Sequence, residues 1–222
     1  MNMTHLPAAA LFDLDGVLID SETEYTRIWE DISEAYPTGI DNFARKIKGM
    51  TLAQILDEHY PDENIRQDVC RMLDIREHAM EYRVFDGVAD FLEELADAGV
   101  PAVIVTSSND EKMRRLSDMQ PSLMSFFRSV VSDSCVKHSK PHPEPYLKGA
   151  EMAGVDAEDC IVFEDSFSGM ASGRAAGAAV VGLATTNPRE SIVGKADVII
   201  DSFGGLTLDG LLEMLSAAGR SF

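Results

Sequence analysis

The sequence has few of the residues that extracellular and nucleic-acid-binding proteins depend on. It contains three cysteines in 222 residues, widely spaced and without a Cys-x-x-Cys pair. Such a set predicts reduced, buried thiols of a cytoplasmic protein rather than a disulfide framework. Lysine and arginine number 19 against 38 acidic residues, which gives a net charge of −19. This charge argues against a nucleic-acid partner, because phosphate backbones are bound by basic surfaces.

Long apolar segments are also missing. No apolar run approaches the roughly 20 residues that a membrane-spanning helix needs. The N-terminal stretch MNMTHLPAAALF has no basic start and no long apolar run, so we expect no signal peptide. We expect a cytoplasmic protein that acts as a monomer and has no membrane partner. Because its net charge is negative, any phosphorylated substrate would have to be attracted by a local cation.

Six short apolar runs recur along the chain, and most are continuous rather than alternating. Continuous runs rich in β-branched residues are typical of strands buried on both faces of a parallel sheet. Helical patterns lie between the runs. Val88, Phe91, Leu92 and Leu95 form one apolar face, and glycines are expected to end this helix and a later one, at Gly99 and Gly154. Alternating strands and helices predict an α/β fold, a doubly wound (Rossmann-like) parallel sheet. The predicted strands lie within residues 8–13, 100–106, 128–133, 160–165, 178–183 and 196–201.

One connection is too long for a single crossover. About seventy residues without a good strand separate the first run from Gly87. Connections between neighbouring elements of a compact domain are usually much shorter. Three amphipathic helices are predicted there: one around Trp29, one around Ile55 with Thr51 as its N-cap, and one through Ile65 and Val69. We therefore predict a small α-helical cap domain at residues 20–84, inserted after the first strand. The α/β core domain would comprise residues 1–19 and 85–222. Ligands of such sheets bind beyond the carboxyl ends of the strands, where the insertion begins.

Polar residues gather where the predicted strands end. Two acids separated by one residue follow the first strand, hydroxyls follow the second, a lysine follows the third, and two more acids follow the fourth. Because these strand ends share one edge of a parallel sheet, the side chains are expected to form one site. The residues are Asp13, Asp15, Thr106, Ser107, Ser108, Lys140, Glu164 and Asp165.

This set suits phosphoryl transfer. Four acids can hold Mg²⁺, which prefers hard oxygen ligands and would offset the repulsion between neighbouring carboxylates. Asp13 can attack phosphorus, as carboxylates do when they form aspartyl-phosphates. Asp15 is placed to protonate the leaving oxygen and then to activate water. Lys140 would balance the charge of the phosphoryl oxygens, while Thr106 and the Ser107 backbone N–H would donate hydrogen bonds to them.

Each fragment also has an ordinary structural interpretation. The stretch DLDG can be a strand that ends in a turn, and VTSSND can be the start of a helix. Lys140 can be a solvated surface lysine. Glu164 and Asp165 can stabilise the N-terminus of the following helix. If these structural interpretations were correct, four unrelated features would all have to place polar residues at the same edge of the sheet. A single functional site formed by these residues is therefore favoured.

Four ordered stretches resemble the motifs of the haloacid dehalogenase superfamily. They are FDLDGVLIDSE, VIVTSS, SKPHPEPYLKGAEMAG and FEDSFSGMASGRAAGA, and the likeness runs from about Leu11 to Asp201. The chain resembles in particular the helical-cap subfamily that includes β-phosphoglucomutase-like sugar phosphatases. The true dehalogenases lack an aspartate at the second position of the first motif, so Asp15 favours phosphoryl transfer.

The resemblance implies a role for each motif residue. Asp13 would be the nucleophile and Asp15 the general acid and base, whose main-chain carbonyl also binds Mg²⁺. Thr106 would be the hydroxyl of the second motif and Lys140 the lysine of the third. Glu164 and Asp165 would be the acids at the metal. The function expected is that of a Mg²⁺-dependent phosphatase acting on a small phosphorylated metabolite, of the sugar phosphate class, through an aspartyl-phosphate.

A phosphosugar mutase of the β-phosphoglucomutase type is the alternative. That enzyme has a cap histidine and a cap arginine for the second phosphate of its substrate. Tyr25 and Leu52 occupy the matching places, and Lys48 is the nearest cation. Losing the arginine weakens the mutase interpretation. Substrate choice would then depend on the loop of Lys48, Gly49, Met50 and Thr51, of which Lys48 and Gly49 are our substrate-binding candidates.

A non-catalytic phospho-receiver domain is a third possibility, since receivers also group acids, a hydroxyl and a lysine. Receivers are about half this length and have no helical insertion. Their lysine also lies late in the chain, where this sequence has Glu164 and Asp165. The receiver interpretation is therefore disfavoured.

Overall fold

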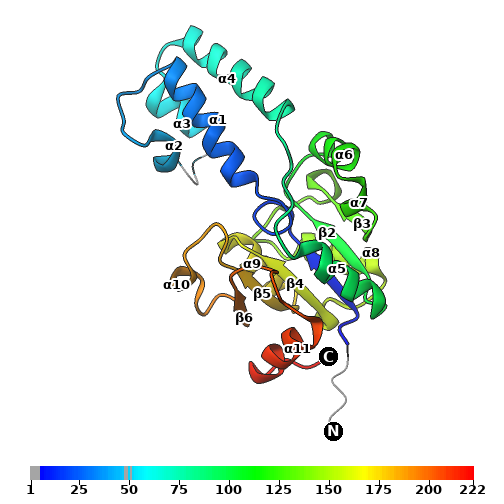
Figure 1. Cartoon of the computed structure of the whole chain (residues 1–222). Coiled ribbons are helices and arrows are strands. Elements are labelled where there is room, and N and C mark those ends of the chain that lie inside the picture. Colours follow the sequence, from blue (N-terminus) through cyan, green and yellow to red (C-terminus); the bar gives the residue numbers. More distant parts are fainter. Residues whose placement is uncertain (1–5, 48–49, 51) are drawn as a thin grey trace. The chain divides into compact units, whose positions relative to one another are not determined.

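The computed structural model describes residues 6–47, 50 and 52–222 of the chain. The chain divides into two compact units, residues 1–20 with 82–222 and residues 21–81. Figure 1 shows the elements of both units. The first is an α/β unit and the second is entirely helical in the residues described.

The α/β unit is built on six parallel strands in the order β3-β2-β1-β4-β5-β6. All six runs predicted from the sequence form these strands, so the doubly wound parallel sheet is confirmed. The order reverses between β1 and β4, which places the switch point of the sheet between these two central strands. The strands are β1 (Ala9–Phe12), β2 (Ala102–Val105), β3 (Phe127–Val131), β4 (Cys160–Glu164), β5 (Ala179–Leu183) and β6 (Val198–Ile200).

Seven α-helices and two short 3₁₀ helices accompany the strands among the described residues. The helices are α5 (Val88–Asp97), α6 (Asp110–Met119), α7 (Pro121–Met124), α8 (Glu144–Ala153), α9 (Phe167–Ala175), α10 (Arg189–Ile192) and α11 (Leu208–Ala217). The 3₁₀ helices are η1 (Asp133–Cys135) and η2 (Ala157–Asp159). The predicted stops after α5 and α8 are glycines, Gly99 and Gly154, in the left-handed conformation that a glycine adopts without strain.

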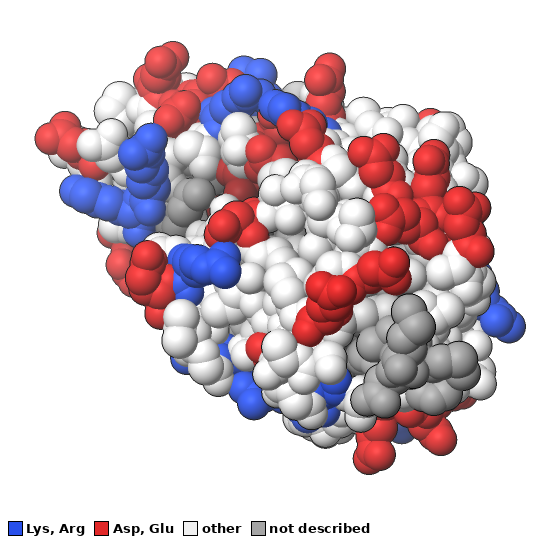
Figure 2. Space-filling model, turned by 60° about the horizontal axis from the view of Figure 1, so that its bottom comes forward, with Lys and Arg blue, Asp and Glu red and all other residues white. Residues whose placement is uncertain are grey.

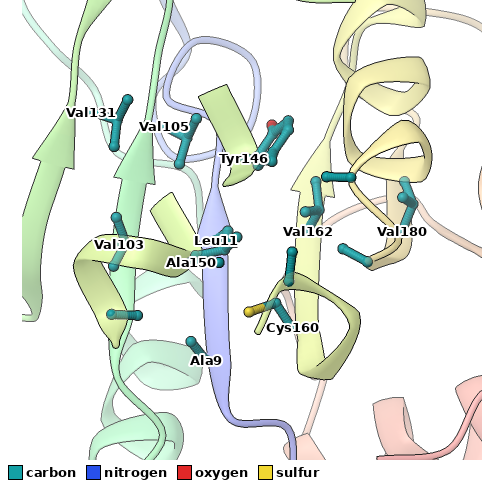
Figure 3. Packing of buried hydrophobic residues seen from close by; sticks show 14 of the residues in the cluster. Ala9, Leu11, Val103, Val105, Val131, Tyr146, Ala150, Cys160, Val162 and Val180 are labelled. Carbon is teal, nitrogen blue, oxygen red and sulfur yellow. The ribbon is translucent and has the colours of Figure 1, made fainter. Parts of the chain in front are cut away.

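One face of the sheet is covered by α8 and α9. Alternate residues of each strand point to this face, where they meet the apolar side of α8 (Figure 3). Tyr146 and Ala150 of α8 lie over Leu11 and Val162 of the central strands. The close approach of α9 depends on Gly173, because a Cβ there would lie 2.9 Å from Val162 Cγ1. The small side chains of this segment therefore allow α9 to pack closely on the sheet.

The opposite face carries an aromatic cluster. The rings of Phe12 and Phe163, on β1 and β4, stack with centroids 4.5 Å apart. Phe91 of α5 meets Phe163 edge-on at 5.5 Å, and Phe203 closes the group. Each such pair contributes about 0.5–1.5 kcal/mol beyond the apolar area it buries. Both central strands are thus held rigidly from either side, directly below the residues that end them.

The helical unit contains α1 (Ser21–Ala35), α2 (Phe43–Lys46), α3 (Leu52–His59) and α4 (Glu63–His78). Three of these helices were predicted, whereas the single turn of α2 was not. Asp62 caps α4 by accepting from the amides of Asn64 and Ile65. Val69 packs inside the unit, but Ile65, predicted on the same apolar face, is exposed. The predicted N-cap of α3, Thr51, lies outside the described residues.

The insertion begins and ends on paired backbone. Ile19 forms an antiparallel bridge with Val84, and the amide of Asp20 donates to the carbonyl of Arg83. Because residues 82–84 pair with residues of the α/β unit, that unit includes them. The helical unit therefore covers 21–81, slightly shorter than the 20–84 expected from the sequence.

The surface agrees with the charge of the sequence. Figure 2 shows acidic side chains over much of the visible face, with smaller groups of lysine and arginine among them. Within the described residues no helix has both the length and the apolarity to cross a membrane. The prediction of buried thiols holds for Cys160 but is wrong for Cys135, which is exposed, and Cys70 is half-buried. Cys135 ends the short η1 turn on the surface rather than lying on a strand.

Candidate active site

The first pair of acids stands at the switch point of the sheet. Asp13 directly follows β1, and its amide donates to the carbonyl of Phe163 on β4 over 3.0 Å. This bond continues the strand ladder and holds the backbone of Asp13 against the neighbouring strand. The residue is buried, with 9% of its surface exposed. A carboxylate in such a place needs a compensating charge.

Lys140 provides that charge. Its side chain is 5% exposed, so it is not the solvated surface lysine of the ordinary interpretation. The Nζ atom lies 2.6 Å from Asp13 Oδ1 and 2.7 Å from Glu164 Oε1. It also donates to the carbonyl of Val105, at the end of β2, over 2.9 Å. The three donors of the ammonium group are thus used at the ends of three different strands.

Glu164, the last residue of β4, is completely buried. Its Oε1 accepts hydrogen bonds from Lys140 and from the hydroxyl of Tyr146. Its Oε2 accepts from the amides of Asp165 and Ser166 and from the Ser166 hydroxyl. These five donors fill the roughly four lone-pair positions that a carboxylate offers. Glu164 is therefore bound on all sides by protein groups, and it also links β4 to the start of α9.

Asp165 is held by the loop that follows β5. Its Oδ2 accepts from the Thr186 hydroxyl, and its carbonyl accepts from Asn187 Nδ2 over 3.0 Å. Gly16 packs against the same carboxylate, and a Cβ there would lie 2.2 Å from Asp165 Oδ2. The motif glycine after Asp15 is therefore required both by its positive φ of 79° and by this close approach.

Three of the predicted acids form a group that could hold a metal ion. Ligand atoms of Asp13, Glu164 and Asp165 all lie within 4.8 Å of one another. With Lys140 as the counter-charge, three carboxylates and one ammonium leave two negative charges uncompensated among these four residues. A divalent cation would restore the balance, so these residues fit a metal.

The buried charges displace the pKa values of the group. Burial raises the pKa of Asp13 well above its usual value, although the charge of Lys140 opposes this effect. Burial, followed by the charge of Glu164, raises the pKa of Asp165 to about 7. Burial acts to lower the pKa of Lys140, but the carboxylates of Asp13 and Glu164 outweigh it, so the pKa is raised. The lysine therefore stays charged.

The second motif lies beyond the end of β2. Thr106 is buried, and its amide donates to the carbonyl of Val131 on β3 over 2.9 Å. Its hydroxyl oxygen accepts from the amide of Ser108 over 3.0 Å, which leaves the hydroxyl hydrogen available for another acceptor. Ser107 is exposed beside it. Asn109 caps α6 by accepting from the amide of Lys112, so this stretch is also the start of a helix.

Asp15 lies apart from the acid group. Its carboxylate accepts from the Ser108 hydroxyl over 2.9 Å and from Lys112 Nζ over 2.6 Å. Lys112 lies outside the motifs of the sequence and was not among the predicted site residues. A signal was present, however, because a lysine in the first turn of a helix opposes the helix dipole. Tyr146, Thr186 and Asn187 were also not identified, because only the folded chain places them against Glu164 and Asp165.

The two substrate-binding candidates of the insertion, Lys48 and Gly49, lie outside the described residues. The helical unit contains a cavity of about 290 Å³. Two residues that the sequence singled out line it, Tyr25 and Trp29 of α1, together with Met50 and Leu52 of the loop and α3. Trp29 is buried and its ring meets Phe43 edge-on, so it belongs to the core of the unit and also borders this space, whereas Tyr25 is half-buried.

The fold and these contacts define an enzyme class, the doubly wound α/β proteins with an acid-rich, lysine-bearing centre at the switch point. The chain belongs to the haloacid dehalogenase-like hydrolase family, whose family model matches residues 10–183.

Named relatives include both kinds of enzyme considered above. Hexitol phosphatase A of Escherichia coli is 29% identical over 207 residues, which cover 89% of this chain and 92% of the relative. The β-phosphoglucomutase of Mycobacterium tuberculosis is 27% identical over 207 residues, covering 78% of this chain and 79% of that enzyme.

Solved structures agree with the fold. A hydrolase of the same family from Deinococcus radiodurans, solved with bound phosphate and sodium, superposes with a TM-score of 0.76 at 26% identity. The match covers 96% of this chain and 97% of the other. The chain is a phosphoric monoester hydrolase of the haloacid dehalogenase type, as its motifs predicted.

Proposed function

We propose that the protein is a Mg²⁺-dependent phosphatase that hydrolyses a small phosphorylated metabolite, of the sugar phosphate class, through an aspartyl-phosphate on Asp13. The observation that carries this proposal is the buried pair of Asp13 and Lys140, 2.6 Å apart at the switch point of the sheet. A buried carboxylate beside a permanently charged lysine is suited to attack an anionic phosphoryl group whose charge the lysine balances.

In the first step, a carboxylate oxygen of Asp13 attacks phosphorus and the bond to the leaving oxygen breaks. Asp15 donates a proton to that oxygen as it departs. Lys140, the Thr106 hydroxyl and the Ser107 amide hold the phosphoryl oxygens in place. Their task is to orient the group in line with Asp13 and to balance its charge.

In the second step, Asp15 takes a proton from water, whose oxygen attacks the aspartyl-phosphate. The bond between phosphorus and the Asp13 oxygen breaks, which releases phosphate and restores the carboxylate. Asp15 thus acts first as an acid and then as a base. Its carboxylate lies apart from the acid group and has its own partners, Ser108 and Lys112.

Asp13 and Asp165 would hold the metal ion through their side chains, and Asp15 through its main-chain carbonyl, as the family resemblance implies. Bound there, Mg²⁺ supplies positive charge to the phosphoryl oxygens and to the crowded carboxylates. Glu164 also belongs to the acid group. Because its oxygens already accept five hydrogen bonds, we propose that it contributes charge and positions Lys140 rather than binding the metal directly.

The substrate class rests on the relatives and on the insertion. The name of the Escherichia coli relative refers to hexitol phosphates, which supports a phosphorylated sugar or sugar alcohol. We propose that the helical unit acts as a cap and that its loop, with Lys48 and Gly49, selects the substrate. We also propose that the enzyme is a cytoplasmic monomer.

A phosphosugar mutase is the second candidate, favoured by the mycobacterial relative. A mutase must hold a bisphosphate at both ends, whereas a phosphatase must let water reach the aspartyl-phosphate. Leu52 stands where the mutase resemblance requires an arginine, and Tyr25 where it requires a histidine. These two differences favour hydrolysis over isomerisation.

The test is phosphate release from a panel of phosphorylated metabolites, with and without Mg²⁺. The panel contains hexose 1- and 6-phosphates, hexitol phosphates, glycerol phosphates, pyrophosphate and nucleotides. We expect Mg²⁺-dependent release from a sugar phosphate and a loss of roughly 10³-fold or more in Asp13→Asn. Asp97→Asn, the same change at an exposed position of α5, serves as the matched control.

Two results would contradict the proposal. Full activity of a folded Asp13→Asn protein would exclude the aspartyl-phosphate. Conversion of β-glucose 1-phosphate to its isomer in the presence of a bisphosphate, without free phosphate, would establish the mutase instead.

A further inference from the structure

We propose that Thr185 and Thr186, just beyond β5, are positioning residues for the metal ion: Thr186 orients the Asp165 carboxylate, and Thr185 fixes the turn that carries the Asp15 carbonyl. The inference rests on the proposed function, because it takes both of these groups as ligands of Mg²⁺. Neither threonine belongs to a motif of the sequence, and only their contacts in the folded chain indicate this role.

The two neighbouring acids of the fourth motif are held in different ways. The oxygens of Glu164 accept five hydrogen bonds from protein groups, which fill the positions that a carboxylate offers. Oδ2 of Asp165 accepts from the Thr186 hydroxyl, and this bond uses one of about four lone pairs. The bond restricts rotation of the carboxylate, while lone pairs remain for a metal ion. Asp165 is therefore the acid of this pair that is both oriented and able to bind.

The hydroxyl of Thr186 is itself oriented. Its oxygen accepts from Asn187 Nδ2 over 3.3 Å, and its hydrogen is donated to Asp165. The same amide nitrogen of Asn187 donates to the main-chain carbonyl of Asp165 over 3.0 Å. Two consecutive residues of one loop thus hold both the side chain and the backbone of this acid.

Thr185 binds the turn of the first motif. Its hydroxyl donates to the carbonyl of Gly16, the residue after Asp15. The amide of Gly16 donates to the carbonyl of Ile19 over 2.9 Å. Because the Asp15 carbonyl belongs to the same planar peptide as the Gly16 amide, the two bonds set the direction in which that carbonyl points.

Gly16 also packs against the groups that Thr186 joins. A Cβ at Gly16 would lie 2.2 Å from Asp165 Oδ2 and 2.8 Å from Thr186 Cγ2. The loop after β5 starts from paired backbone, since the amide of Ala184 donates to the carbonyl of Ile200 on β6 over 2.9 Å. The loop is therefore anchored on the sheet at the point from which it holds two proposed ligands.

Such contacts matter because a metal ion binds most tightly where its ligands are already in place. Without the Thr186 hydroxyl, the Asp165 carboxylate could take several orientations, and ordering it would reduce the affinity. Groups that orient metal ligands typically change the affinity about 10–100-fold when they are removed. The threonines act on the ligands, so the effect should appear in Mg²⁺ binding itself, without a substrate.

The experiment measures the Kd of Mg²⁺ from the thermal midpoint as a function of Mg²⁺ concentration. Each variant is compared with its own metal-free state. Thr186→Val keeps the shape of the side chain and removes the hydroxyl, so we expect the Kd to rise about tenfold or more. Thr186→Ser keeps the hydroxyl and should recover most of the affinity. Thr185→Val should also raise the Kd.

Two further variants separate positioning from general stability. In an Asp165→Ala background, Thr186→Val should add no further rise in the Kd, because the hydroxyl acts through that carboxylate. Thr207→Val is the matched control, since it removes a hydroxyl that accepts from the Gly210 amide and caps α11 in the same unit. This variant should lower stability and leave the Kd unchanged.

An unchanged Kd in either folded valine variant would overturn the role of that threonine, whatever happens to its metal-free midpoint. A Kd that rises equally in Thr186→Ser would also contradict the inference, because serine keeps the donor. If Thr186→Val does not fold, Thr186→Ala is compared in the same way. A wild-type protein that binds Mg²⁺, with no difference among its variants, contradicts this inference alone. A wild-type protein whose midpoint does not respond to Mg²⁺ contradicts the proposed metal site as well.

Discussion

Tyr146 donates its phenolic hydrogen to Oε1 of Glu164 over 2.8 Å, and both side chains are completely buried. The tyrosine belongs to α8 and the glutamate to β4, so this bond joins the helix to the strand that ends at the acid group. Burial, followed by the charge of Glu164, raises the pKa of Tyr146 well above its usual value. The hydroxyl thus remains a donor at every pH at which the protein would be assayed.

The first prediction concerns this bond. Tyr146→Phe removes one donor from a buried carboxylate, and we expect the free energy of unfolding to fall by about 1.5–3 kcal/mol. Activity should fall much less, because Lys140 still binds Glu164. Urea unfolding and phosphate release measure the two effects.

The matched control for this variant is Tyr60→Phe. The Tyr60 hydroxyl is buried and has no hydrogen-bond partner within the described residues, so its removal should leave stability unchanged or slightly increased. Equal losses of unfolding free energy in both variants would show that the hydrogen bond to Glu164 adds no stability to the protein.

The second prediction concerns Gly169 of α9, which packs against the same glutamate. A Cβ at this position would lie 1.6 Å from Glu164 Oε1, and a buried, fully bonded carboxylate has no room to withdraw. Gly169→Ala should therefore displace Glu164, with a loss of about 1–3 kcal/mol or more in stability and a large loss of activity. Thermal unfolding and phosphate release provide the measurements.

Gly204→Ala is the control for this substitution. A Cβ there meets only the Ser202 hydroxyl at 3.4 Å, so the change should be tolerated. A Gly169→Ala protein with wild-type stability and activity would mean that Glu164 is not held as tightly as its contacts indicate.

The third prediction concerns metal binding without reference to activity. Adding Mg²⁺ to metal-free protein should raise the thermal midpoint, because an ion that binds only the folded state stabilises it by about 2.7 kcal/mol at a hundred times its Kd. Asp165→Asn removes one proposed ligand and should reduce this shift, whereas Asp97→Asn should preserve it. The readout is the midpoint as a function of Mg²⁺ concentration. An undiminished shift in Asp165→Asn would place the ion elsewhere.

The fourth prediction concerns the thiols. Burial, and then the charges of Asp159 and Asp156, raise the pKa of Cys160 to about 12. Because the thiolate is the reactive form, roughly one Cys160 in ten thousand is reactive at pH 8. Cys135 is exposed. A thiol reagent should therefore label Cys135 first and Cys160 only after unfolding.

Cys135→Ser tests the assignment of the fast reaction. This variant should lose the fast phase of labelling and keep the slow one. Rapid labelling of Cys160 in the folded protein would contradict its burial under α8 and η2.

Much of the fold was open to prediction because its signals are local. The six apolar runs of strand length are dictated by burial on both faces of a parallel sheet, and all six form strands. The glycine stops after α5 and α8 follow from conformational preference at single residues. The exposure of Ile65 was not predictable in this way, since a helical period does not show how wide the buried face of a helix is.

In the candidate site, too, some features have local sequence signals and others depend on the folded chain. Asp13, Asp15, Glu164 and Asp165 were found because each lies at or just beyond the end of a strand, and parallel strands bring these ends to one edge of the sheet. The sequence alone determined this gathering of acids, hydroxyls and a lysine, and with it the chemistry that the site can perform.

Only the tertiary structure decided how the charges are paired. It binds Lys140 to Asp13 and Glu164, surrounds Glu164 with five donors, and gives Asp15 a separate lysine in Lys112. Such pairings depend on distances of a few tenths of an ångström between residues up to 127 positions apart in the chain. Local sequence patterns carry no information on these distances, because packing of α6 and α8 against the sheet sets them.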